Sequence, residues 1–218
     1  VASAAAGMLL YQASKDLPDY ESLANYEPPV MTRIHAHDGS LISEFARERR
    51  IFVPVNSIPK RVLGAFLSAE DRRFYEHGGI DFQGIARAVV AAVETKIRGG
   101  KKRPQGASTI TQQVAKNFLL TNERSIERKL KESAIAIELN RQFSKEQILE
   151  WYLNSISYGG VYIGIQAASQ GYFGKPASEL TLAEASLLAG IPQQPSAYSP
   201  VSQPQAAVAR QQEVLRLM

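Results

Sequence analysis

The 218-residue sequence contains no cysteine and only three histidines. The lack of cysteine excludes disulfides, thiolate metal sites and cysteine nucleophiles. The histidines are His35, His37 and His77, and this small number argues against a multi-histidine metal site.

A strong excess of charge is also missing. Lysine and arginine total 25 against 21 acidic residues, which gives a net charge of +4 and a pI near 9.3. This balance mildly favours anionic partners such as phosphates, lipid headgroups or nucleic acid, and it is too small to choose among them. Hydrophobic residues make up 44% of the chain, enough to bury a sizeable core.

The apolar run at the start of the chain is short. It is VASAAAGMLLYQ, about a dozen residues, too few to span a bilayer. Its abrupt beginning predicts that residues 1–17 are the outer end of a truncated transmembrane helix, with an ordinary buried helix as the alternative. Residues 18–57 are predicted to form a linker and a β-hairpin that turns at Asp38-Gly39. RIFVPV at 50–55 predicts a short third strand at a sheet edge.

The rest of the chain has helical periodicity, which predicts a mainly α fold. Apolar spacing and caps predict helices over 59–70, 82–97, 106–119, 124–142, 144–157, 161–171, 181–189 and 203–218. Ser144 with Gln147, and Thr181 with Glu184, have capping-box spacing. The helix over 82–97 is rich in alanine and valine and is expected to lie deep in the core. The glycine and basic run that follows it predicts a mobile loop.

Chemistry is first suggested by the stretch from Glu70 to Asp81, EDRRFYEHGGID. Two adjacent acids are followed by arginines, aromatics, a histidine and a Gly-Gly break. This pattern indicates an acidic helix end that faces a cleft. An acid that removes a proton needs a second site for the leaving group, so a basic partner is expected downstream.

A basic partner exists on the helix that starts near residue 124. Helical spacing places Arg124, Arg128, Lys131 and Glu132 on one face. Three cations around one carboxylate suit a polyanionic group such as a diphosphate. A solvated face of salt bridges is the alternative.

A polar stripe is predicted on the helix within GASTITQQVAKN, residues 106–117. It contains Ser108, Gln112 and Lys116 at four-residue intervals, with Thr109 and Gln113 alongside. Hydroxyls and amides suit sugars, and the lysine suits a phosphate. An N-capped amphipathic helix with an ordinary polar face explains the same pattern.

Together these segments resemble a known family. EDRRFYEHGGID, GASTITQQVAKN, RKLKE, ILEWYLN and TLAEASLLAGIPQQPSAYSP follow, in order, the motifs of family 51 peptidoglycan glycosyltransferases. These enzymes occur as monofunctional proteins and as the glycosyltransferase domain of class A (bifunctional) penicillin-binding proteins. The resemblance covers about residues 60–200, and five ordered motifs make it specific.

The resemblance implies a lysozyme-like, two-lobed helical domain over 58–200, with 201–218 as a helix leading towards a transpeptidase domain. It implies a single-pass anchor in the bacterial cytoplasmic membrane, with the catalytic domain on the periplasmic side. The substrates would be lipid II and the nascent glycan chain. Further partners would be the membrane surface and other cell-wall synthesis proteins, and no nucleic acid is expected.

The resemblance also implies residue roles for an inverting polymerisation of lipid II. Glu70 would be the general base, and Asp71 would orient it or share its charge. Glu132 would assist departure of the diphosphate, through a divalent Mg²⁺ or Mn²⁺ if a metal takes part, and no organic cofactor is implied. The diphosphate would be held by Lys116, Arg124, Arg128 and Lys131, and the substrate sugars by Ser108, Thr109, Gln112 and Gln113. Phe74, His77 and Gly78 would be structural members of the first motif.

Two other functions remain open, a lysozyme-like glycan-cleaving enzyme and a non-catalytic membrane-surface module. The segment from Ile85 to Lys102, apolar and then basic, is a candidate for lying at the membrane surface and gating the site as a mobile lid. A core helix with a disordered tail is the alternative.

Overall fold

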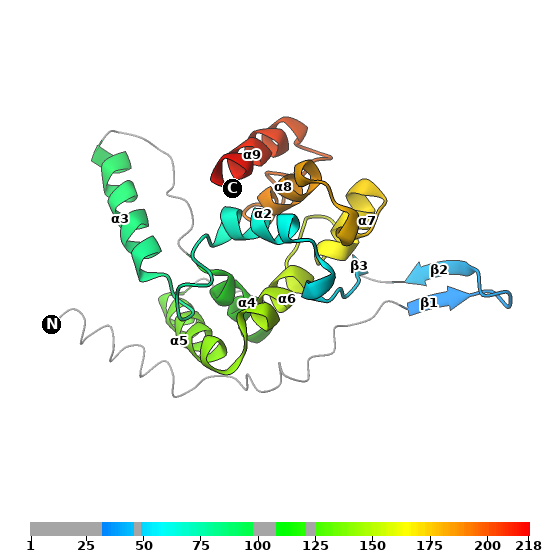
Figure 1. The fold of residues 1–218 in the computed structure, drawn as a ribbon, viewed down its shortest axis with the longest axis horizontal. Coiled ribbons are helices and arrows are strands. Elements are labelled where there is room, and N and C mark those ends of the chain that lie inside the picture. The colour runs from blue at the N-terminus through cyan, green and yellow to red at the C-terminus, as the bar shows by residue number, and fades with distance from the viewer. Residues whose placement is uncertain (1–31, 46–48, 98–107, 121–124) are drawn as a thin grey trace. The chain divides into compact units, whose positions relative to one another are not determined.

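A computed structural model of the chain describes residues 32–45, 49–97, 108–120 and 125–218 (Figure 1). The strands are β1 (Thr32–His35), β2 (Leu41–Phe45), β3 (Arg49–Arg50) and β4 (Tyr162–Ile163). The helices are α2 (Lys60–Glu70), α3 (Phe82–Ile97), α4 (Ile110–Leu119), α5 (Ile126–Gln142), α6 (Lys145–Ser155), α7 (Ile165–Phe173), α8 (Leu182–Gly190) and α9 (Pro204–Leu217). The predicted mainly α class is confirmed. The predictions for residues 1–17 and for the loop after Ile97 lie outside the described residues.

The described residues divide into two compact units, in agreement with the expected two-lobed architecture. The first is Glu70–Leu149. The second joins Glu150–Met218 to the described residues up to Ala69. The chain leaves the second unit at the end of α2 and returns to it within α6, so the acidic stretch that begins at Glu70 belongs wholly to the first unit.

Helices α4 and α5 pack side by side in the first unit (Figure 1). Their buried apolar residues are Ile110, Val114 and Ala115 on α4, and Ala134, Ile135, Ala136 and Leu139 on α5. Side-chain caps start both helices: Thr109 Oγ1 accepts from Gln112 N at 3.1 Å, and Ser125 Oγ accepts from Arg128 N at 3.0 Å. The caps lie outside the helices, so both helices begin later than predicted.

The two predicted capping boxes are confirmed. At the start of α6, Ser144 N donates to Gln147 Oε1 at 2.9 Å and Gln147 N donates to Ser144 Oγ at 3.1 Å. At the start of α8, Thr181 and Glu184 make the same reciprocal pair. These short local patterns fix where each helix begins.

In the second unit, α8 packs on α9, and Phe66 of α2 meets Tyr158 edge to face with ring centroids 6.1 Å apart. Asn154 of α6 holds the chain before α2, because its side-chain amide accepts from Val53 N and donates to Val53 O, both at 2.9 Å. Glu150 Oε2 accepts from Val55 N at 2.8 Å. These contacts fix the approach to α2.

The predicted hairpin is confirmed, since β1 and β2 pair antiparallel around Gly39, which has φ +83°. The predicted strand over 50–55 is wrong. Only Arg49–Arg50 is extended in a ladder, and it pairs in parallel with β4 instead of extending the hairpin. Pro54 cannot donate to a ladder, and Val55–Ser57 forms a 3-10 turn.

The expectation that α3 lies deep in the core is wrong, because none of its residues is buried. Its apolar side chains are exposed: Phe82 67%, Ile85 37%, Val89 57%, Val90 57%, Val93 53% and Ile97 79%. Helical spacing places these residues on one side of the helix. None of the helices in the described ranges is both long enough and apolar enough to cross a membrane.

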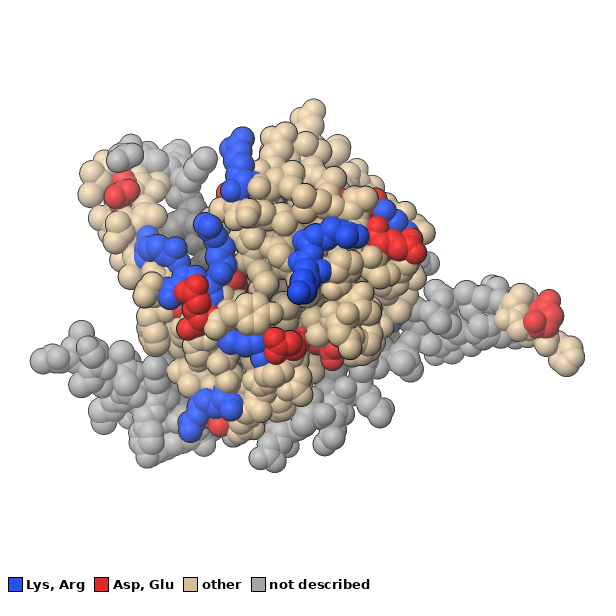
Figure 2. Space-filling model, in the orientation of Figure 1, with Lys and Arg blue, Asp and Glu red and all other residues tan. Residues whose placement is uncertain are grey.

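Acidic and basic side chains are interspersed over the face of the molecule shown in Figure 2. Several acidic and basic residues of the described ranges form pairs, such as Arg73 with Glu76 at 2.7 Å and Lys175 with Glu184 at 2.7 Å. This mixture is what the small net charge predicts.

Candidate functional site

Glu70 is the last residue of α2, and Gln113 lies in the first turn of α4. Gln113 Nε2 donates to Glu70 Oε2 at 2.8 Å. Both side chains are half-buried. An amide donor favours the ionised form of a carboxylate, which is the form that a general base requires.

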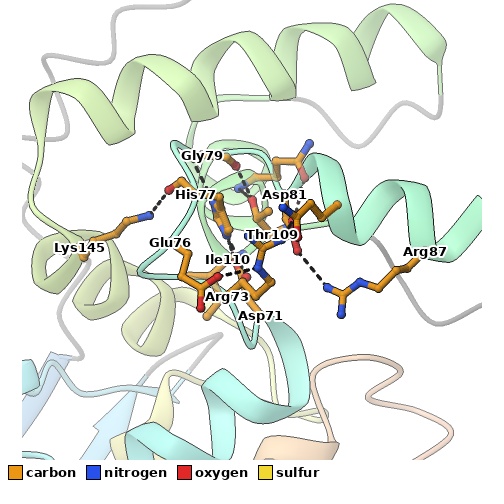
Figure 3. Close-up of polar contacts among 12 residues, drawn as sticks. Asp71, Arg73, Glu76, His77, Gly79, Asp81, Arg87, Thr109, Ile110 and Lys145 are labelled. Atoms are coloured by element: carbon orange, nitrogen blue, oxygen red, sulfur yellow. Dashed lines mark hydrogen bonds and ion pairs between the residues drawn. The ribbon is translucent and has the colours of Figure 1, made fainter.

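Asp71 lies next to Glu70 and is only 6% exposed. Its Oδ1 and Oδ2 lie 2.9 and 3.0 Å from His77 Nε2, and Oδ2 accepts from Ile110 N at 3.0 Å (Figure 3). Ile110 is the first residue of α4, where the backbone N–H has no partner within the helix and the helix dipole favours a carboxylate. Asp71 therefore ties the loop after α2 to the start of α4.

The rest of this loop is held by His77 and Phe74. Gly79 N donates to His77 Nδ1 at 3.2 Å, so the ring proton is assigned to Nε2, which donates it to Asp71. Lys145 Nζ donates to His77 O at 2.7 Å and lies 4.5 Å from the centre of the Phe74 ring, which is 1% exposed. Burial lowers the pKa of Lys145, and the negative charge of Asp71 opposes that shift. Phe74 and His77 thus pack and hydrogen-bond within the loop, and a structural role for both stays a prediction.

The structural glycine of the loop is Gly79, although Gly78 was expected to fill that position. Gly79 has φ +100°, and a Cβ there would lie 2.2 Å from the carbonyl oxygen of Ala136 on α5. No atom lies within 4 Å of the corresponding position at Gly78. The carbonyl oxygen of Gly79 also accepts from Thr109 Oγ1 at 2.6 Å. The loop therefore packs against α4 and α5 through Gly79.

Thr109 and Gln112, expected to contact a sugar, are each only 2% exposed. Gln112 Oε1 accepts from Thr109 N at 2.9 Å, and Gln112 Nε2 donates to Ser133 Oγ of α5 at 3.0 Å. Their polar atoms thus cap α4 and link it to α5. Such burial favours a positioning role for both residues over direct contact with a sugar.

Glu132 on α5 is a buried carboxylate, 2% exposed, that two cations neutralise. Arg128 Nη1 donates to Glu132 Oε2 at 3.0 Å, and Lys129 Nζ contacts Glu132 Oε1. Lys129 Nζ also donates to Ser108 Oγ at 2.8 Å. The Lys129 side chain is 46% exposed, in contrast to the buried Glu132. The cluster carries one net positive charge within the first unit.

Of the two cations beside Glu132, Arg128 was predicted from the sequence and Lys129 was not. Lys131 pairs instead with Glu127, 2.9 Å away. At about 100° per residue, Lys129 and Glu132 are separated by only about 60° around the helix, whereas Lys131 and Glu132 are separated by about 100°. These helical angles, applied to the RKLKE motif at 128–132, would have identified Lys129 as the neighbour of Glu132 from the sequence alone.

The remaining predicted cations are Lys116 and Arg124. Lys116 is exposed on α4 and makes no hydrogen bond or ion pair with the residues that the structure describes. It follows Gln113 by three residues, which places both on one side of α4. Arg124 lies outside the described ranges.

The donor set around Glu132 does not fit a divalent metal. Mg²⁺ and Mn²⁺ take oxygen ligands, and two or more carboxylates usually supply them. Both Glu132 oxygens already accept from cations, and no group of three acidic or histidine residues in the described ranges could hold an ion. Arg128 and Lys129 neutralise Glu132 instead.

A family model described as Transglycosylase matches residues 38–218, which include every residue of the site above. The chain belongs to the transglycosylase family. The following relatives confirm the resemblance to the glycosyltransferase domain of class A penicillin-binding proteins.

The transglycosylase chain is 50% identical to penicillin-binding protein 1A of Rickettsia felis over 192 residues, which are 88% of the chain and 24% of that protein. It is 45% identical to penicillin-binding protein 1A of Neisseria flavescens over 202 residues, 93% of the chain and 25% of that protein. A crystal structure of penicillin-binding protein 1A from Haemophilus influenzae aligns with a TM-score of 0.46 at 25% identity, over 88% of the chain and 18% of that structure. The chain thus spans about a quarter of the length of the curated relatives that it matches.

Proposed function

We propose that this transglycosylase domain polymerises lipid II into β-1,4-linked glycan strands and releases a polyprenyl diphosphate. One observation carries the proposal: the same compact unit contains both a carboxylate and a cationic cluster. The carboxylate is Glu70, hydrogen-bonded by an amide, and the cations are Arg128 and Lys129. The carboxylate can accept a proton, and the cations can hold an anionic leaving group.

In the proposed reaction, Glu70 accepts the proton of the 4-hydroxyl of the acceptor's N-acetylglucosamine. That oxygen then forms a bond to C1 of the donor's N-acetylmuramic acid, on the face opposite the diphosphate. The bond between C1 and the phosphate oxygen breaks, and the diphosphate leaves with the electron pair. One inversion converts the α-linked diphosphate into a β-1,4 link.

The leaving group gains negative charge as the C1–oxygen bond breaks. Lys129 is accessible and uses two of its three donors, on Ser108 and Glu132, which leaves one for a phosphate oxygen. Lys116 adds a second accessible ammonium on α4. Glu132 keeps Arg128 and Lys129 in place, so the cations are arranged before charge develops, which is the basis of electrostatic catalysis.

The proposed function is tested by the product made from labelled lipid II. We expect the 218-residue chain in detergent to consume lipid II and to give long glycan strands that a muramidase degrades. If it shortens preformed glycan and leaves lipid II intact, it is the glycan-cleaving enzyme; if it does neither, it is a non-catalytic module. A hydrolase of neutral glycan has no diphosphate to hold, so the cation cluster favours polymerisation.

The exposed apolar side of α3 supports membrane contact, since the polyprenyl chain of the substrate stays in the bilayer. The exposed apolar side chains of α3 and its length of 16 residues suit a helix that lies flat at the membrane–water interface. From the sequence, residues 85–102 were a candidate for contact with the membrane surface. The structure describes this segment as far as Ile97.

Replacement of Val89 and Val93 by serine should weaken binding to anionic phospholipid vesicles by at least about tenfold. Each valine is more than half exposed, and the loss of two such side chains from the interface corresponds to about 1.4 kcal/mol or more. Sedimentation with vesicles measures the effect, in a form without residues 1–20 so that the N-terminal apolar run does not contribute.

The matched control replaces Val201 and Val208, exposed by 79% and 48%, with serine. It removes exposed valines from another part of the chain and should bind vesicles like the wild type. If vesicle binding weakens equally in both variants, α3 is not the part of the chain that contacts the membrane.

A further inference from the structure

Gln113 was expected to bind a sugar, yet its amide is already engaged. A carboxylate can only accept, so the Gln113 side chain must turn its NH₂ group towards Glu70. The distance of 2.8 Å between Gln113 Nε2 and Glu70 Oε2 is that of a strong hydrogen bond to a charged group.

Gln113 is itself placed by the residue that follows Glu70. Asp71 accepts from Ile110 N at 3.0 Å and so fixes the first residue of α4. Ile110 and Gln113 are three residues apart, which places them about one helical turn apart on the same side. The contacts form a closed ring through Glu70, Asp71, Ile110 and Gln113.

Further contacts hold the start of α4, the part of the helix that takes part in this ring. Thr109 caps the helix, and its hydroxyl donates to Gly79 O at 2.6 Å. Gln112 links the same turn to Ser133 of α5 at 3.0 Å. Glu70 is thus held at its backbone through Asp71 and at its carboxylate through Gln113.

The geometry points to Gln113 as the positioning residue of Glu70, with Asp71 fixing the helix that carries it; this inference rests on the proposed function. Neither residue takes part in bond making. A base must lie within hydrogen-bond reach of the proton that it removes, and a displacement of about 1 Å can cost about 10²-fold in rate. The amide limits the movement of the Glu70 carboxylate through its Oε2 atom.

Gln113→Met is expected to lower kcat by about 10- to 100-fold and to leave the KM for lipid II within about twofold. Methionine keeps the length of the side chain and removes both amide donors. Loss of alignment weakens only the transition state, whereas loss of a sugar contact raises KM with kcat preserved. Initial rates of glycan formation across lipid II concentrations separate these two outcomes.

Three further variants sharpen the test. Gln113→Glu keeps the side-chain shape but loses the NH₂ donors, so its kcat should fall at least as far. Gln212→Met makes the same replacement at an exposed glutamine of α9 and should match the wild type. In a Glu70→Gln background, Gln113→Met should change the residual rate by less than about twofold, because Gln113 acts through Glu70. Thermal unfolding of each variant verifies its fold.

The possible failures are distinguishable. If the wild type does not polymerise lipid II, the proposed function fails. If the wild type is active and Gln113→Met either matches it or changes only KM, the positioning role fails while the proposed function stands. An independent loss of rate in the Glu70→Gln background would also overturn the positioning role.

Discussion

Glu70→Gln is expected to leave the fold intact and to slow glycan polymerisation by about 10²- to 10⁴-fold. Removal of a positioned general base costs this much, which corresponds to about 3 to 5 kcal/mol of transition-state stabilisation. The glutamine has the same shape, and its carbonyl oxygen can still accept from Gln113 Nε2, as Glu70 Oε2 does at 2.8 Å. The initial rate of glycan formation from labelled lipid II measures the loss.

The matched control is Glu76→Gln. Glu76 lies in the same acidic stretch, and its side chain is 63% exposed and paired with Arg73. An exposed ion pair contributes little to stability, so this variant should retain activity within about twofold of the wild type. A polymer yield from Glu70→Gln equal to that of the control would exclude Glu70 as the base.

Local patterns in the sequence predicted most of the helices, because the signals that start a helix lie within a few residues of each other. The capping boxes at Ser144 and Thr181 were identified from a serine or threonine followed three residues later by glutamine or glutamate. The hairpin turn at Asp38-Gly39 is equally local. Each of these signals is a set of contacts among residues only a few positions apart, so it can be recognised without knowing how distant parts of the chain pack.

Predictions that depended on tertiary packing were less accurate. Alanine and valine in α3 suggested a core helix, but nothing in the composition tells whether another element covers them. A third strand was expected over residues 50–55 at a sheet edge. Only Arg49–Arg50 forms a ladder, and its partner is β4, more than 100 residues away. Burial and strand pairing are set by distant residues, and periodicity alone does not identify those residues.

The site was predicted as a set of residues more accurately than as a set of contacts. The sequence placed Glu70 and Glu132 in separate motifs and gave Glu132 cationic neighbours. Arg128 is one of them, as expected, and the second is Lys129 where Lys131 was expected. From the sequence, every residue on the polar stripe of α4 was predicted to bind substrate. Only the packing of α4 on α5 and on the loop separates the buried Thr109 and Gln112 from the accessible Lys116.

Gly79→Ala should destabilise the first unit by at least about 3 kcal/mol, whereas Gly78→Ala should be neutral or stabilise it by up to about 1 kcal/mol. A Cβ at Gly79 would lie 2.2 Å from the Ala136 carbonyl oxygen, and its φ of +100° is unfavourable for any residue with a side chain. At Gly78 a Cβ meets nothing within 4 Å, and the alanine only restricts the unfolded chain. Urea unfolding followed by circular dichroism measures both changes.

The Gly79 substitution should also affect catalysis below its unfolding transition. Gly79 O accepts from Thr109 Oγ1 at 2.6 Å and Gly79 N donates to His77 Nδ1 at 3.2 Å, so a shift of the loop strains both the cap of α4 and the His77–Asp71 pair. These contacts hold the helix that carries Gln113. We therefore expect a folded Gly79→Ala protein to lose polymerisation rate while Gly78→Ala retains it. Equal stability and equal rates for the two variants would show that the loop is not held through Gly79.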